Sequence, residues 1–275
     1  MRALGPYLDN LLTRGRAYFS KEEAMKALGQ SSDAFLAAAA RLTKKRRLAS
    51  PKQGFYLILR PEDQVTGAPD PVRWIDPLMR HLGLDYRISL LRAAAFHGAS
   101  HQAAMVFQVI APKQISMLEL GRHKIQFVYQ APDAFAETNQ PDWLDRMKSD
   151  AGFAMVAGVE LTLLDSARYL HKAAGINGAA QIIHDLGAKA DPRKLAKAAR
   201  VYENSAVRRL GYLLEHFGHE RQANALLPYA QKAKSMKPLD PSVKLLAALI
   251  EAGGERHERN MKWKLDLNET VEIDL

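Results

Sequence analysis

The sequence predicts an α+β protein in which a small N-terminal winged helix-turn-helix is followed by a larger mixed α/β domain. Three observations predict this fold class: positive charge is concentrated in the first 60 residues, the same segment shows a helix-turn-helix pattern followed by a hairpin, and helical and strand patterns are mixed beyond it. With 275 residues, 47% hydrophobic and 25% charged, the composition is that of a globular protein of about two domains.

The charge is distributed unevenly along the chain. Residues 1–60 hold 12 Lys and Arg against four Asp and Glu, so they carry +8 of the formal net charge of +9. Residues 61–275 are therefore close to neutral. Such an asymmetry is typical of a protein in which one module binds a polyanion. A solvated basic face without a partner is the alternative interpretation.

Local signals in the basic segment predict three helices. Residues 6–13 have apolar side chains at helical spacing, and Ser20-Lys-Glu-Glu23 is a capping box that starts a helix over residues 21–28. Gly29 ends that helix, and Ser31 and Ser32 offer an N-cap for a third helix from Asp33 to about Lys45. The expected buried stripe of the third helix is Phe35, Leu36, Ala39 and Leu42. Two helices joined by a short turn with Gly form a helix-turn-helix.

A predicted wing follows the third helix. Apolar stretches at residues 48–50 and 55–59 flank Pro51-Lys-Gln-Gly54, which is a turn sequence between two strands. In this arrangement the third helix enters the major groove of DNA. The candidate DNA-binding residues are Ser31, Ser32 and Arg41 on the helix, Lys44, Lys45, Arg46 and Arg47 at its end, and Lys52 and Gln53 at the wing tip. Cations at a helix C-terminus also stabilise the helix by about 0.3–1 kcal/mol through its dipole, without any contact to DNA. Four consecutive cations are more than this role requires, so DNA contact is the favoured interpretation.

The rest of the chain is expected to form one further domain, residues 72–275, that folds by itself. Residues 61–71 (PEDQVTGAPDP) are rich in Pro, Gly and acids and are expected to be a linker. Helices are predicted at residues 72–82 and 86–96 and around 159–170, 180–186, 195–202, 207–217 and 223–232. Strands are predicted at residues 103–111, 115–118, 124–129, 153–157 and 261–267, with a short apolar piece at 243–249.

The stronger motifs of catalysis and cofactor binding do not occur in the sequence, which has no P-loop, G-x-G-x-x-G, G-x-S-x-G or H-E-x-x-H. The groups with metal-ligand spacing are His97 with His101, and His216 with His219 and Glu220. Gly98 and Gly218 interrupt the helices that would align them, so structural roles are expected. Asp165 is expected to be a buried carboxylate that bonds a neighbouring loop. We therefore expect no enzyme, no metal and no cofactor.

Four segments carry a family resemblance through their order along the chain. They are Gly54-Phe-Tyr-Leu-Ile58, Leu90-Leu-Arg-Ala-Ala-Ala-Phe-His-Gly-Ala99, Val156-Ala-Gly-Val-Glu-Leu-Thr-Leu-Leu-Asp165 and Trp263-Lys-Leu-Asp-Leu-Asn268. In this order the chain resembles the antitoxins of AbiE-type, type IV toxin-antitoxin systems. The resemblance implies a winged helix that binds the promoter of its own operon. It also implies a C-terminal domain that counteracts a nucleotidyltransferase-like toxin, with or without a stable complex.

Two other classes of function stay open at the level of the sequence. One is a ligand-responsive transcriptional repressor, and the other is a DNA-directed, metal-dependent nuclease. The chain has no cysteine, Asp9 interrupts the N-terminal segment before it reaches signal-peptide length, and no apolar run approaches the roughly 18 residues of a membrane span. A cytoplasmic protein without a membrane partner is therefore expected.

Overall fold

The chain folds into two compact units. A computed structural model describes residues 3–99, 106–149, 152–243 and 258–273. The first unit consists of Met1–Ile88, Met105–Pro132 and Arg146–Val156, and the second of Ser89–Ala104, Asp133–Asp145 and Ala157–Leu275. The domains expected from the sequence are continuous segments with boundaries at residues 60 and 71, whereas each compact unit combines segments that are distant in sequence. The predicted domain boundaries stay a prediction.

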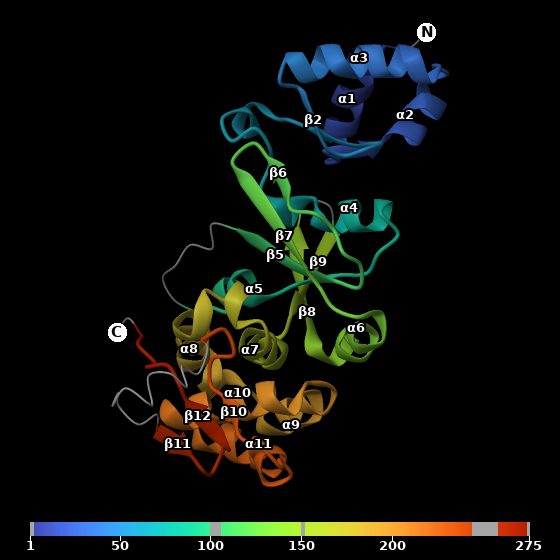
Figure 1. Ribbon diagram of the computed structural model, residues 1–275. Coiled ribbons are helices and arrows are strands. Elements are labelled where there is room, and N and C mark those ends of the chain that lie inside the picture. The colour runs from blue at the N-terminus through green and yellow to red at the C-terminus, as the bar shows by residue number, and fades with distance from the viewer. Residues whose placement is uncertain (1–2, 100–105, 150–151, 244–257, 274–275) are drawn as a thin grey trace. The chain divides into compact units, whose positions relative to one another are not determined.

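The first unit begins with the winged helix-turn-helix (Figure 1). Its elements are α1 (Leu4–Thr13), β1 (Tyr18–Ser20), α2 (Lys21–Leu28), α3 (Ser32–Lys44), β2 (Leu48–Lys52) and β3 (Phe55–Ile58). The strands form an antiparallel sheet in the order β1-β3-β2. The Ser20 side chain caps α2 by accepting from Glu23 N, and Gly29 ends α2 in the left-handed conformation. The predicted helices and hairpin are confirmed to within a few residues at their ends.

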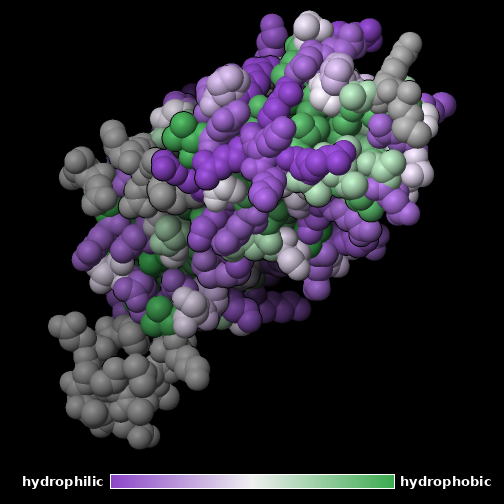
Figure 2. All heavy atoms as spheres, turned by 90° about the horizontal axis from the view of Figure 1, so that it is seen from above, coloured by the Kyte–Doolittle hydropathy of each residue, from purple (hydrophilic) through white to green (hydrophobic). Residues whose placement is uncertain are grey.

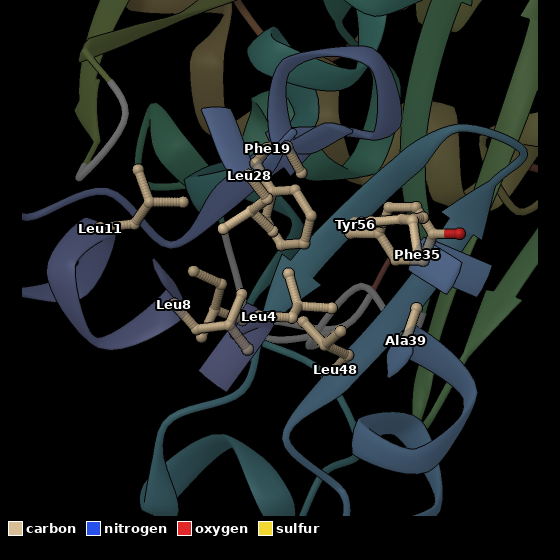
Figure 3. Packing of buried hydrophobic residues seen from close by; sticks show 11 residues of the cluster. Leu4, Leu8, Leu11, Phe19, Leu28, Phe35, Ala39, Leu48 and Tyr56 are labelled. Atoms are coloured by element: carbon tan, nitrogen blue, oxygen red, sulfur yellow. The ribbon is translucent and has the colours of Figure 1, made fainter. Parts of the chain in front are cut away.

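A cluster of buried apolar side chains from all of these elements holds the winged helix together (Figure 3). Three aromatic rings lie at its centre: Tyr56 stacks on Phe19 at 5.4 Å between ring centroids and meets Phe35 edge-on at 5.3 Å. The predicted buried stripe of α3 is wrong at one residue. Leu36 is 44% exposed, because the face of α3 that meets the core is centred on Phe35 and Ala39.

The segment predicted as the linker contains two short 3-10 helices, η1 (Pro61–Gln64) and η2 (Pro71–Arg73). Asp63 is buried, accepts a hydrogen bond from Arg60 N at 3.1 Å and pairs with Arg73 at 3.3 Å. The carbonyl of Thr66 accepts a bond from the backbone N–H of Arg122 at 2.8 Å. These contacts give the segment a fixed path within the first unit.

The remainder of the first unit contributes most of a mixed sheet in the order β6-β7-β5-β4-β9-β8. The strands are β4 (Arg87–Ile88), β5 (Phe107–Ala111), β6 (Leu118–Leu120), β7 (His123–Tyr129), β8 (Leu144–Ser149) and β9 (Gly152–Ala157). Strand β5 runs parallel to β7, and β4 runs parallel to β9. The predicted helix over residues 72–82 is shorter, α4 (Ile75–His81), and the predicted strand over 115–118 begins only at its last residue. Part of the predicted strand at 103–111 lies outside the described residues.

The second unit is mainly helical. Its helices are α5 (Leu90–Phe96), α6 (Pro132–Thr138), α7 (Val159–Arg168), α8 (Gly175–Leu186), α9 (Pro192–Ala198), α10 (Asn204–His216) and α11 (Glu220–Gln231). The predicted helix over residues 86–96 was wrong at its start, where the chain forms β4 before α5 begins. The helices predicted from residue 159 onward are confirmed. No helix within the described ranges has the length and apolar character needed to cross a membrane.

A small C-terminal sheet in the order β10-β12-β11 completes the second unit. Its strands are β10 (Lys237–Pro238), β11 (Glu258–Asn260) and β12 (Leu265–Leu267). The strand predicted over 261–267 is therefore shorter, because residues 261–264 form a turn. Most of the apolar piece at 243–249 lies outside the described residues. Arg208 and Arg209 of α10 are buried and donate to the carbonyls of Lys264 and Leu239, and burial lowers the pKa of Arg209 to about 10.

Candidate nucleic-acid interface

The N-terminal end of α3 is tied to the wing through one lysine. Ser31 is the N-cap of α3, and its hydroxyl oxygen accepts from Ala34 N at 3.3 Å. The Ser32 hydroxyl oxygen accepts from Lys21 Nζ at 2.7 Å, while the backbone N–H of Lys21 donates to the carbonyl of Gly54 in the wing turn at 2.8 Å. Both serines keep a hydroxyl hydrogen that can be donated to a phosphate or a base edge.

The wing turn has a defined position within the first unit. The side chain of Ser50 donates to the carbonyls of Lys52 and Phe55, and the carbonyl of Gln53 lies 3.2 Å from His81 Nε2. Gln53 is exposed and Lys52 is half-buried. Since the wing turn and Ser32 both contact Lys21, the predicted residues Ser31, Ser32, Lys52 and Gln53 converge on one region.

The C-terminal end of α3 has an unusual backbone. Arg46 N donates to the carbonyl of Thr43 and Arg47 N to that of Leu42, both at 2.9 Å, which is the Schellman pattern. Arg46 occupies its left-handed position with φ of 53°. Glycine is the usual residue there, because any side chain disfavours this conformation by about 1 kcal/mol. Arg46 thus keeps a cation at a position where the backbone favours glycine.

The basic residues at this end differ in their partners. Arg41, Lys44, Lys45 and Arg46 are exposed, and among the residues that the structure describes their side chains form no ion pair. Arg47 is half-buried and pairs with Asp9 of α1. The structure therefore presents four unneutralised cations at the end of α3 and assigns Arg47 a structural contact as well.

A groove of about 640 Å³ opens beside this basic end of α3, inside the first unit. One wall contains Thr43, Arg46 and β2, and the other contains the segment 64–67 with the β6–β7 turn. A Cβ atom on Gly121 of that turn would lie 2.0 Å from the Thr66 carbonyl oxygen, so only glycine permits this close approach. Arg122 follows directly and is exposed on the groove. The lining includes two arginines and no carboxylate.

The nine predicted residues therefore form two groups rather than one. Because α3 has 13 residues, its two ends lie about 20 Å apart at a rise of 1.5 Å per residue. Ser31, Ser32, Lys52 and Gln53 lie near one end, and Arg41 and the run from Lys44 to Arg47 lie at the other. Sequence reasoning missed Lys21 and Arg122. The first could be suspected from its place directly after the cap Ser20, whereas nothing local in the sequence indicates the second.

Three of the acidic and histidine residues considered from the sequence, Asp165, His97 and His219, have structural partners. Asp165 is fully buried and accepts from Ser89 Oγ at 2.7 Å and from Tyr202 OH at 2.8 Å. His97 and His219 bond the carbonyls of Ala157 and His184 at 2.7 and 3.0 Å, and His101 lies outside the described residues. In the described part of the chain no group of three or more His, Asp or Glu side chains is arranged to hold a metal ion.

Comparisons with known proteins found a similar fold for nearly the whole chain and a family match for its central part. The crystal structure of the RV2827C protein from Mycobacterium tuberculosis has a similar fold, with a TM-score of 0.61 at 15% sequence identity over 94% of this chain and 89% of that one. No curated protein matches significantly in sequence. Residues 87–216 match the AbiEi antitoxin C-terminal domain. This segment includes two of the four resemblance segments and runs from β4 to the end of α10, and the match supports membership of the chain in the AbiE-type antitoxin family.

Proposed function

We propose that this antitoxin binds the promoter of its own operon through the winged helix and counteracts a nucleotidyltransferase-like toxin through its AbiEi domain. The observation that carries the DNA-binding part is the set of four exposed, unneutralised cations at the end of α3. The toxin-directed part is supported by the family match over residues 87–216.

Arg46 gives independent support to DNA binding. A residue in a disfavoured backbone conformation points to a functional constraint, since glycine at the same place would be more stable. In the proposed complex Arg46 and Arg122 contact the phosphate backbone of the duplex along the groove between them. A phosphate group of the duplex suits this groove, because the charged side chains that line it are both arginines.

The affinity for DNA is expected to depend steeply on salt. The exposed cations Arg41, Lys44, Lys45, Arg46 and Arg122, together with the half-buried Lys52, offer about 4–6 phosphate contacts, so the plot of log affinity against log salt concentration should have a slope of roughly −4 to −5. Titration of the protein into a labelled duplex from the region upstream of its own gene, at 50 to 300 mM salt, measures the slope. An affinity that hardly changes over this range would contradict the proposed interface.

Replacing Arg46 with glycine separates stability from binding. The Arg46→Gly variant should be more stable than the natural protein by about 0.5–1 kcal/mol, because it relieves the left-handed backbone. It should nevertheless bind duplex DNA less tightly and lower the magnitude of the salt slope by about one. Arg46→Lys is the matched control, which keeps both the charge and the backbone conformation. A glycine variant with undiminished affinity would remove Arg46 from the interface.

A further inference from the structure

The outward face of α3 is apolar in its middle. Its exposed residues between the two charged ends are Ala34, Leu36, Ala37 and Ala40. The opposite face, with Phe35 and Ala39, is buried in the core of the winged helix, so the face is not required for folding. In Figure 2, which looks down on the molecule from the side of α3, hydrophobic side chains are interspersed with hydrophilic ones.

Polar groups that can read bases are confined to the ends of α3. Ser31, Ser32 and Asp33 lie at the N-terminal end and Arg41 at the C-terminal end. The middle turns have neither a donor nor an acceptor on their exposed side chains. In the major groove the one base feature that an apolar side chain can read is the C5-methyl group of thymine.

We infer that α3 recognises thymine methyl groups in the central base pairs of the DNA segment that it contacts, and that Leu36 is the specificity-determining residue. This inference rests on the proposed function, namely that α3 enters the major groove. The 44% exposure of Leu36 makes it the longest apolar side chain available on the face, and the neighbouring alanines let the helix backbone approach the base edges closely. Lys21, Arg41 and Lys44 around the face carry the charge that complements the phosphates on either side.

Thymine and uracil differ only in this methyl group, so they provide the test. The probe is the duplex upstream of the protein's own gene, prepared once with thymine and once with uracil in every thymine position. A buried methyl contributes roughly 0.8 kcal/mol, or about fourfold in affinity, so loss of two or three contacts should weaken binding roughly 15- to 60-fold. Base-pair hydrogen bonds and phosphates are the same in both probes.

Variants distinguish direct contact from a change in DNA shape. Leu36→Asn should bind the thymine duplex more weakly, and its ratio of affinities for the two duplexes should fall several-fold toward one. Met117→Asn is the matched control: Met117 is 50% exposed in the first unit outside the winged helix, and this change should keep the full thymine preference. An uracil effect that is as large in Leu36→Asn as in the natural protein would overturn the inference.

The remaining outcomes are also decisive. Equal binding of the two duplexes by the natural protein would overturn the inference while leaving DNA binding intact. If the thymine duplex binds no better than a random duplex of equal length and base composition, the proposed function fails instead. A DNA-free protein whose mass by light scattering shows a dimer, and becomes monomeric with Leu36→Asn, would assign the face to a second copy of the chain and overturn the inference as well.

Discussion

The Trp263→Ala variant is expected to lower the stability of the second unit by about 3–5 kcal/mol, the usual loss when a fully buried tryptophan is truncated. Trp263 lies in the turn between β11 and β12 and is fully buried against α10. Its indole Nε1 donates to the Glu215 carboxylate, which Lys262 also contacts. The indole therefore connects the C-terminal sheet to α10, the helix at which the AbiEi domain match ends.

The indole fits against α10 because residue 211 is glycine. A Cβ atom at Gly211 would lie 2.1 Å from Trp263 Cζ3, a distance that no pair of unbonded carbons tolerates. Gly211→Ala should therefore displace the ring and destabilise the unit in the same way. Because both changes remove one contact, the double variant should be no less stable than Trp263→Ala alone.

Amide hydrogen exchange in α10 measures this loss locally, which suits a chain with two compact units. Met261→Ala is the matched control in the same turn, since Met261 is 70% exposed, and it should change the free energy of opening by less than about 0.5 kcal/mol. Exchange in α10 that is as slow in Trp263→Ala as in the natural protein would show that the C-terminal sheet does not stabilise this helix.

The winged helix could be predicted closely because its signals are local. Ser20 fixes the start of α2 by accepting from Glu23 N, Gly29 fixes its end, and the turn before Phe55 joins two short strands. The second half of the predicted capping box does not form, because the Glu23 carboxylate pairs with Arg16. Each signal acts over a few residues, so neighbouring sequence suffices. The candidate site was predicted in part for the same reason: the basic run at the end of α3 is contiguous in sequence.

Features that depend on distant partners could not be predicted. Strand β4 has only two residues and is defined by its pairing with β5 and β9. No local pattern therefore separates it from the helix that follows, and the two were predicted as one helix. Arg122 reaches the groove beside α3 only because Gly121 lies against Thr66, more than 50 residues earlier. Pairs such as Gly211 with Trp263 carry no local pattern, since the glycine is explained only by the ring that it admits.

A variant with strongly weakened DNA binding is expected to keep its protection against the toxin. In Lys44→Ala/Lys45→Ala/Arg46→Ala three exposed cations are removed, while Arg47 is retained because it pairs with Asp9. At 0.15 M salt each phosphate contact contributes about fivefold to affinity through counterion release, so the loss should be roughly 100-fold for specific and random duplexes alike. Repression of a reporter placed behind its own promoter should therefore disappear.

Protection should survive because the three substitutions are exposed and lie in the first unit, outside the AbiEi domain at residues 87–216. The experiment expresses the cognate toxin from an unrelated inducible promoter, so that transcriptional silencing plays no part in rescue, and compares growth with the natural antitoxin, the triple variant and Trp263→Ala. The triple variant should restore growth as the natural protein does, whereas Trp263→Ala should lose protection while retaining DNA binding. A triple variant that is present at the natural level and folded, yet leaves the cells unprotected, would show that protection requires the DNA-binding surface, because the toxin's own promoter is absent from this assay.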